Sequence, residues 1–195
     1  MMNRTAKLRL LALIPLLLAA LWYPAQKIRS YEFPAVPPQE FRFRVDGVDP
    51  YDPFRGRYIT LDIKTPELET EDFTFRPYKY AVLGRDKDNF ATVTELSEKN
   101  TPNRPCLRIR YHGITRKWQG NQRLEKGTHR FIFPFTRYFL NEKNASAADE
   151  LLRKAKQAEL LVLIYPDGNY AVKELIIDGK PLREAIEAKQ RAEQN

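Results

Sequence analysis

The residues best suited to chemistry lie together in one short segment, residues 49–58. Turn-forming and charged side chains follow one another there: Asp49, Pro50, Asp52, Pro53, Arg55, Gly56, Arg57 and Tyr58. An aspartate before a proline favours a turn, because its carboxylate bonds nearby backbone amides and the proline ring fixes φ. Two arginines on either side of a glycine are able to grip a carboxylate or a phosphate. The segment is therefore a candidate binding corner, and the alternative is a rigid connection between strands whose charges are solvated.

Carboxylates give the chain a second interpretation, that of a hydrolase. Asp49, Asp52 and Glu142 would serve as general acid and base if the fold brought them together in a cleft. A nucleophile is harder to find, because no nucleophile motif surrounds any of the three serines, Ser30, Ser97 and Ser146. The sequence therefore favours a binding protein over an enzyme.

Metal and cofactor sites have no support in the residue pattern. His112 and His129 belong to no cluster with metal-ligand spacing, and the single cysteine, Cys106, excludes a cysteine-based metal site and an intramolecular disulfide. The eight glycines are scattered singly and would not form a phosphate-cradling loop. Cys106 opens an apolar alternating stretch, so we expect it to be a buried small side chain. We expect no metal and no cofactor.

The positive charge of the chain is concentrated at its N-terminus. The formal net charge is +8, and residues 1–30 hold five of the 33 basic residues and none of the 25 acidic ones. Residues 31–195 therefore carry 28 basic and 25 acidic residues, a net charge of only +3. No dense basic stretch with interleaved aromatic residues remains, so we expect no nucleic-acid partner.

Residues 1–26 have the pattern of a membrane anchor. Arg4, Lys7 and Arg9 precede an uncharged run of 17 residues, 10–26, which is within the range of a membrane span. Trp22 and Tyr23 lie near its end, where aromatic rings favour the membrane interface. The sequence predicts a transmembrane helix here. A buried helix of the core is the alternative, but the preceding cations and the terminal position speak against it.

The predicted anchor determines the expected location of the rest of the chain. Signal-peptide cleavage requires small residues at positions −1 and −3, and cutting after Ala20 or Ala25 would put Leu18 or Tyr23 at −3. The anchor is therefore expected to stay uncleaved. Basic residues at its N-terminal end favour the cytoplasmic side. We expect a single-pass protein of the cytoplasmic (inner) membrane with residues 27–195 in the periplasm.

Beyond the anchor, the sequence predicts a mainly β (α+β) domain with an antiparallel sheet. Prolines mark an extended spacer over 27–40, the domain covers 41–180, and a helical tail covers 181–195. Apolar runs, mostly alternating, predict strands at 41–45, 58–63, 78–83, 90–96, 107–112, 131–135, 160–165 and 170–177. The run 160–165 is apolar on both faces and predicts a central strand. One internal helix is expected to begin at Ser146, with Asp149 as its capping partner, and a second covers 182–192.

A family resemblance rests on three of these segments. Residues 56–63 read Gly-Arg-Tyr-Ile-Thr-Leu-Asp-Ile and resemble the motif of the GDYXXLXY family of bacterial membrane-anchored proteins. Residues 137–142 resemble that family's aromatic segment ending in Glu142, and residues 165–179 resemble its closing turn and strand. Arg57 stands where the motif has Asp, and Ile63 stands where it has the last Tyr. A function that needs that carboxylate would be absent or altered in this chain.

The resemblance implies an N-terminal membrane helix, an outward β-rich domain and no assigned activity. It directs attention to Tyr58, Leu61 and Glu142 as motif positions, and it implies a polytopic membrane protein as partner, because members often occur beside such proteins. The expected function is an extracytoplasmic accessory domain that binds through the segment 49–58. Two alternatives remain: an envelope hydrolase that uses its carboxylates, and a catalytically dead domain similar to the β-domain of signal peptidases, without their Ser/Lys dyad.

Overall fold

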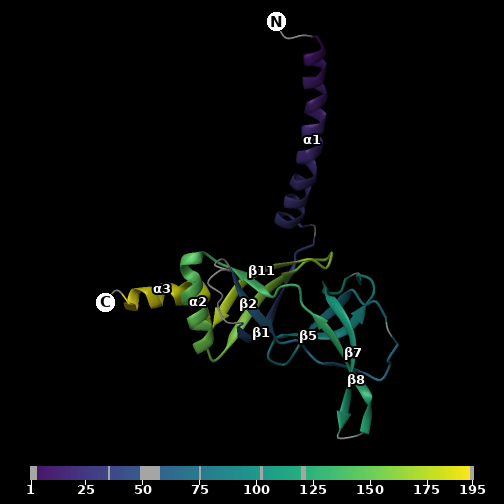
Figure 1. Ribbon diagram of the computed structural model, residues 1–195, viewed down its shortest axis with the longest axis vertical. Helices are drawn as coiled ribbons and strands as arrows, with labels where there is room; N and C mark the ends of the chain where they lie inside the picture. The colour runs from purple at the N-terminus through teal and green to yellow at the C-terminus, as the bar shows by residue number, and fades with distance from the viewer. Residues whose placement is uncertain are drawn as a thin grey trace. The chain divides into compact units, whose positions relative to one another are not determined.

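The computed structural model describes residues 4–34, 36–48, 58–74, 76–101, 103–119 and 122–193. The chain consists of two compact units, Met1–Pro37 and Pro38–Asn195 (Figure 1). The second unit is β-rich with antiparallel sheets, an internal helix and a C-terminal helix, as the sequence predicts.

The first unit is one helix, α1 (Arg4–Glu32), which contains Pro15 and Pro24. Within the parts of the chain that the structure describes, no helix reaches the length and apolarity needed to cross a membrane. Residues 27–32, expected in the extended spacer, continue the helix instead. Pro24 removes only one backbone donor, and the residues after it are able to carry on the helical hydrogen bonding.

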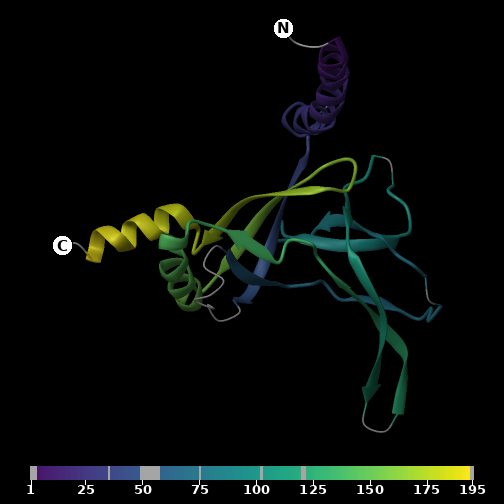
Figure 2. The same cartoon turned by 45° about the horizontal axis from the view of Figure 1, so that its top comes forward.

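The largest sheet of the second unit has six strands in the order β12-β11-β10-β1-β2-β9, all antiparallel to their neighbours (Figure 2). They are β1 (Gln39–Val48), β2 (Tyr58–Ile63), β9 (Arg137–Phe139), β10 (Ala158–Ile164), β11 (Tyr170–Ile177) and β12 (Lys180–Pro181). The apolar run predicted to form a central strand is β10, which lies between β11 and β1. Leu160 and Val162 are fully buried there, which confirms the prediction.

Two three-stranded sheets complete the β-structure, in the orders β3-β8-β7 and β5-β4-β6. Their strands are β3 (Leu68–Thr70), β4 (Tyr80–Arg85), β5 (Ala91–Ser97), β6 (Cys106–Arg108), β7 (Arg110–Gln119) and β8 (Gln122–Ile132). The predicted hairpin is confirmed by the pairing of β4 with β5. Cys106 is buried with 2% of its surface exposed, as expected.

Two predicted strands differ from the observed ones. The single strand expected over 107–112 is divided at Ile109 between two sheets, because Ile109 bonds Lys79 while Arg108 bonds Gly168. The strand expected over 131–135 ends at Ile132, since Pro134 has no N–H to continue a ladder. The rings of Phe133 and Phe135 stack instead with their centroids 5.4 Å apart.

The second unit contains the helices α2 (Glu142–Lys154) and α3 (Leu182–Glu193), which pack against each other. The predicted cap of the internal helix is wrong. Asn141 is the N-cap, because its side chain accepts from the N–H of Lys143, whereas Ser146 lies inside the helix. The predicted C-terminal helix is confirmed, and Leu182 and Ile186 are its buried side chains.

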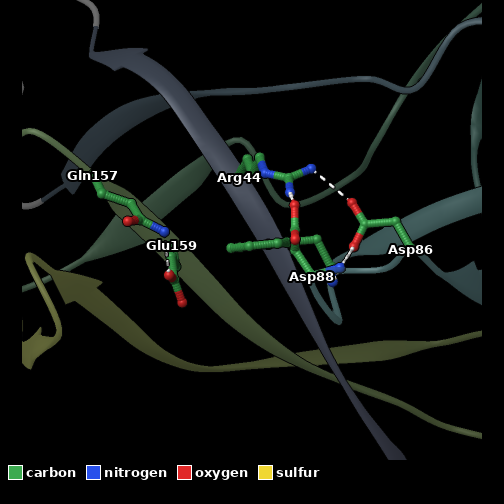
Figure 3. A network of polar contacts seen from close by, with 6 residues as sticks. Arg44, Asp86, Asp88, Gln157 and Glu159 are labelled. Atoms are coloured by element: carbon green, nitrogen blue, oxygen red, sulfur yellow. Dashed lines mark hydrogen bonds and ion pairs between the residues drawn. The ribbon is translucent and has the colours of Figure 1, made fainter.

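Two arginines of β1 form ion pairs, Arg44 with residues outside the large sheet (Figure 3) and Arg42 within the sheet. Arg44 donates to Asp86 at 2.8 Å and to Asp88 at 2.9 Å, in the turn between β4 and β5. The backbone N–H of Phe90 also donates to Asp86, which lowers the pKa of that carboxyl below its usual value. Arg42 forms an ion pair with Glu159 of β10, whose carboxylate is 8% exposed and also accepts from Gln157.

A surface ion-pair cluster joins α2 and α3. Lys154 and Lys189 both donate to Glu150, and these hydrogen bonds lower the pKa of Glu150 to about 2. A carboxylate whose pKa falls on folding stabilises the fold above its unfolded pKa near 4.5 and loses that effect as pH falls toward 2.

We therefore expect Glu150→Gln to lower the melting temperature at pH 7, with a difference from the parent that shrinks between pH 4.5 and pH 2. Because the cluster is exposed, 1 M NaCl should reduce the difference as well. Circular dichroism melts across this pH series measure it. A difference that stays constant from pH 7 to pH 2 would contradict the assigned role of the charge.

Candidate functional site

Most of the segment expected to bind lies outside the described residues. This applies to Asp49, Asp52, Arg55, Gly56 and Arg57. Glu142 begins α2, and its side chain lies outside the description too. The two motif residues that the structure places are Tyr58 and Leu61, both in β2.

The motif strand β2 has one face in the core and one face outward. Ile59 and Leu61 are each 2% exposed and belong to the core, whereas Tyr58 alternates to the opposite face. Along its edge β2 pairs with β9, so that Tyr58 faces Phe139 and Ile59 faces Tyr138. The motif strand and the aromatic segment, which the sequence resemblance treats separately, are thus neighbours in one sheet.

An aromatic and cationic cluster covers the outward face of these two strands. The rings of Tyr58 and Phe139 have centroids 5.8 Å apart, and the guanidinium carbon of Arg137 lies 4.8 Å from the centroid of Tyr58. Phe139 is 70% exposed, so its ring is accessible at the surface of β9.

A groove of about 850 Å³ lies beside β9. One wall is the segment 134–139, the other is residues 170–173 of β11, and Arg110 of β7 completes the lining. The volume is within the range of protein ligand sites. A smaller cavity of about 290 Å³ continues from it, because both are lined by Arg110, Pro134, Thr136 and Tyr170.

Two tyrosines tie the walls of the groove together at its ends. The hydroxyl of Tyr170 donates to the carbonyl of Pro134 at 3.0 Å, and the hydroxyl of Tyr138 bonds the backbone of Leu175. Burial raises the pKa of both phenols, so both stay neutral near pH 7. The walls therefore run in the same direction, with Pro134 beside Tyr170 and Tyr138 beside Leu175.

The lining of the groove is cationic. Arg110, Arg137 and Lys173 contribute to it, and none of the described lining residues carries a carboxylate. Lys173 forms an ion pair with Glu40 at 2.6 Å, and this hydrogen bond raises the pKa of the lysine. The guanidinium of Arg137 lies over a ring rather than beside an acid. A groove of this charge attracts an anionic group.

The histidines lie in a different cavity, of about 790 Å³, beside β8. Tyr111 and His129 share a hydrogen bond of 2.9 Å, and burial lowers the pKa of His129, which favours the neutral ring at pH 7. Among the described residues, no group of three or more His, Cys, Asp or Glu is placed to hold a metal ion.

The groove residues come from three parts of the chain that are distant in sequence. Arg110, Tyr170 and Lys173 have no local pattern that separates them from other residues of exposed strands. Arg137 and Phe139 were indicated only by the resemblance of residues 137–142 to a family segment. The signal that would have found the groove is the pairing of β2 with β9, which a single sequence does not contain.

Comparison with known proteins gives one match. The sequence model of the family described as GDYXXLXY protein matches residues 17–175, which is most of the chain and includes every described residue of the groove. No curated protein and no solved structure matches the chain.

Proposed function

The chain belongs to the GDYXXLXY protein family, and from that premise we propose that it is a membrane-tethered accessory protein whose periplasmic domain binds an anionic segment of a partner. The single observation that carries the proposal is the groove lined by Arg110, Arg137 and Lys173. The partner is a polytopic protein of the same inner membrane, as the family resemblance implies.

The N-terminal helix supports the tethering part of the proposal. From Ile14 onward its large apolar side chains are more than half exposed: Ile14, Leu16, Leu17, Leu18, Leu21, Trp22, Tyr23 and Ile28. An apolar surface of this extent needs a covering that the first unit itself does not supply. Lipid is the covering we propose, with the uncharged run 10–26 in the bilayer and the preceding basic residues on the cytoplasmic side.

The charge of the groove favours binding over hydrolysis. General acid–base hydrolysis by carboxylates needs two of them at the substrate, whereas the described lining offers arginine, lysine and aromatic side chains. Arginine forks hold carboxylates or phosphates bidentately, and aromatic rings add apolar contact. Recognition of an anionic segment is the task that this set of side chains performs best.

Photocrosslinking of the full-length chain in its own membranes tests the proposal. We expect a photoreactive phenylalanine analogue at Phe139 to capture a membrane protein, and the same analogue at exposed Glu98, away from the groove, to capture none. Arg110→Gln with Arg137→Gln should reduce capture from position 139 at least tenfold, since both substitutions remove the charge and leave a polar side chain. Equal capture from positions 139 and 98 would refute a binding role for the groove. Capture that does not change when Arg110 and Arg137 are replaced would refute it as well.

Extraction at alkaline pH tests the tether separately. The full-length chain should stay with sedimented membranes after a carbonate wash, and a chain without residues 10–26 should not. Release of the full-length chain by the wash would contradict insertion into the bilayer while leaving the binding test unaffected.

A further inference from the structure

Within the residues that the structure describes, the groove lies between two strand edges, at 137–139 and 170–173, that pair with no further strand on the groove side. On the β9 side, the N–H of Leu61 donates to the carbonyl of Thr136 at 2.8 Å. In an antiparallel pair, successive residues point their backbone groups alternately toward and away from the partner. Tyr138 therefore points its backbone groups to β2, whereas Arg137 and Phe139 point theirs into the groove.

The β11 side has a matching free edge. Its strand pairs with β10 over its whole length, but with β12 only at Ile176 and Ile177. Among the described residues, the backbone of residues 170–173 is paired with β10 on one side and with no strand on the other side. Half of the backbone N–H and C=O groups of this stretch thus point away from β10, toward the groove.

The two walls of the groove are joined by tyrosine side chains that reach from one wall to the other. Tyr170 and Tyr138 make such a crossing at opposite ends of the groove. Figure 2 shows β9 and β11 both running toward the helices that follow them. A strand placed between them would therefore have the same orientation relative to both walls.

We propose that the groove accepts an extended acidic peptide segment, which inserts between β9 and β11 as an additional strand of the large sheet. This inference rests on the proposed function, because it specifies how the anionic segment of the partner is held. Main-chain hydrogen bonds to the two edges supply affinity, and side chains at alternate positions supply specificity.

The side chains of the walls define the composition of the occupant. Arg137 and Lys173 are both exposed, so peptide side chains that point outward meet two cations, of which Lys173 is also paired with Glu40. Side chains that point inward meet Phe135 and Val172, which are apolar. Acidic and apolar residues in strict alternation therefore satisfy both faces of the groove.

A synthetic peptide tests this mode of binding. The probe is a fluorescein-labelled octapeptide of alternating glutamate and valine, titrated with the full-length chain in detergent solution and followed by fluorescence anisotropy. Two matched peptides serve as controls: one with every valine N-methylated, which keeps all side chains but loses alternate backbone donors, and one with lysine in place of glutamate.

The expected result is saturable binding of the glutamate–valine peptide, at least tenfold weaker binding of the N-methylated peptide, and no binding of the lysine peptide. Arg110→Gln with Arg137→Gln should weaken binding of the glutamate–valine peptide at least tenfold. Hydrogen exchange at the amides of Arg137 and Phe139 should slow when the peptide is bound, because these amides become donors.

Equal binding of the N-methylated peptide would overturn strand insertion and leave an anion-binding groove, as in the proposed function. No binding of the glutamate–valine peptide, with charge-dependent capture in membranes intact, would also overturn insertion alone. Loss of charge dependence in both assays would overturn the proposed function together with the inference.

Discussion

Replacing Phe43 by alanine is expected to lower the free energy of unfolding by about 4 kcal/mol, the middle of the range for buried phenylalanine. Phe43 is 2% exposed in β1 and faces Leu160 of β10. Its ring meets those of Phe133 and Phe135 edge-on, with centroids 5.1 Å and 4.7 Å away. Truncation would remove both contacts and leave a cavity at the centre of the large sheet.

The same substitution at Phe139 is the matched control for this prediction. Phe139 is 70% exposed, so Phe139→Ala should change the free energy of unfolding by less than about 0.5 kcal/mol. Urea unfolding of the full-length chain, followed by circular dichroism, measures both variants. Binding of the glutamate–valine peptide should fall only for Phe139→Ala at temperatures where both variants stay folded. Equal stability losses would show that the large aromatic cluster is not the core.

Arg42→Met is expected to cost about 3 kcal/mol, the lower end of the range for removing one partner of a buried ion pair. The carboxylate of Glu159 is 8% exposed and would lose its cation, keeping only the amide of Gln157. The lower end applies because the side chain of Arg42 is 38% exposed, so water is able to replace part of the lost interaction. Arg42 also lies over the ring of Phe90, a contact that methionine largely preserves.

The double variant Arg42→Met with Glu159→Leu separates the lost charge from lost packing. Because it leaves no carboxylate unpaired, its stability should return to within about 1 kcal/mol of the parent. The two single variants and the double variant form a thermodynamic cycle in urea. Additive effects, with the double variant the least stable of the set, would contradict the assigned ion pair.

Strands with clean alternation were predictable from the sequence, and the hairpin with two register shifts, β7 with β8, was not. Ile59, Leu61 and Ile63 alternate cleanly, and all three are buried in β2. The hairpin of β7 and β8 was missed, because its register shifts between Tyr111 and Gly113 and again between Arg116 and Trp118. Each bulge moves the following side chains to the other face, which erases the period of two that sequence reading depends on.

The candidate site was less predictable than the fold, for a different physical reason. Its walls are residues 134–139 and 170–173, and each looks like part of an ordinary strand or connection. What makes them a site is the curvature of one sheet, which brings β9 opposite β11 although three strands separate them in the sheet order. Curvature arises from the packing of the whole domain, so a local pattern does not encode it.

The pairing of β1 with β10 has a consequence for the folding of the chain during its synthesis. Arg42 and Glu159 form an ion pair across these two strands and are 117 positions apart in the sequence. A ribosome that adds about 5–20 residues per second leaves β1 without its partner for roughly 6–23 seconds. During that interval Phe41 and Phe43 lack the β10 side chains opposite them, and the β10 side of β1 is an unpaired edge on which another chain could pair.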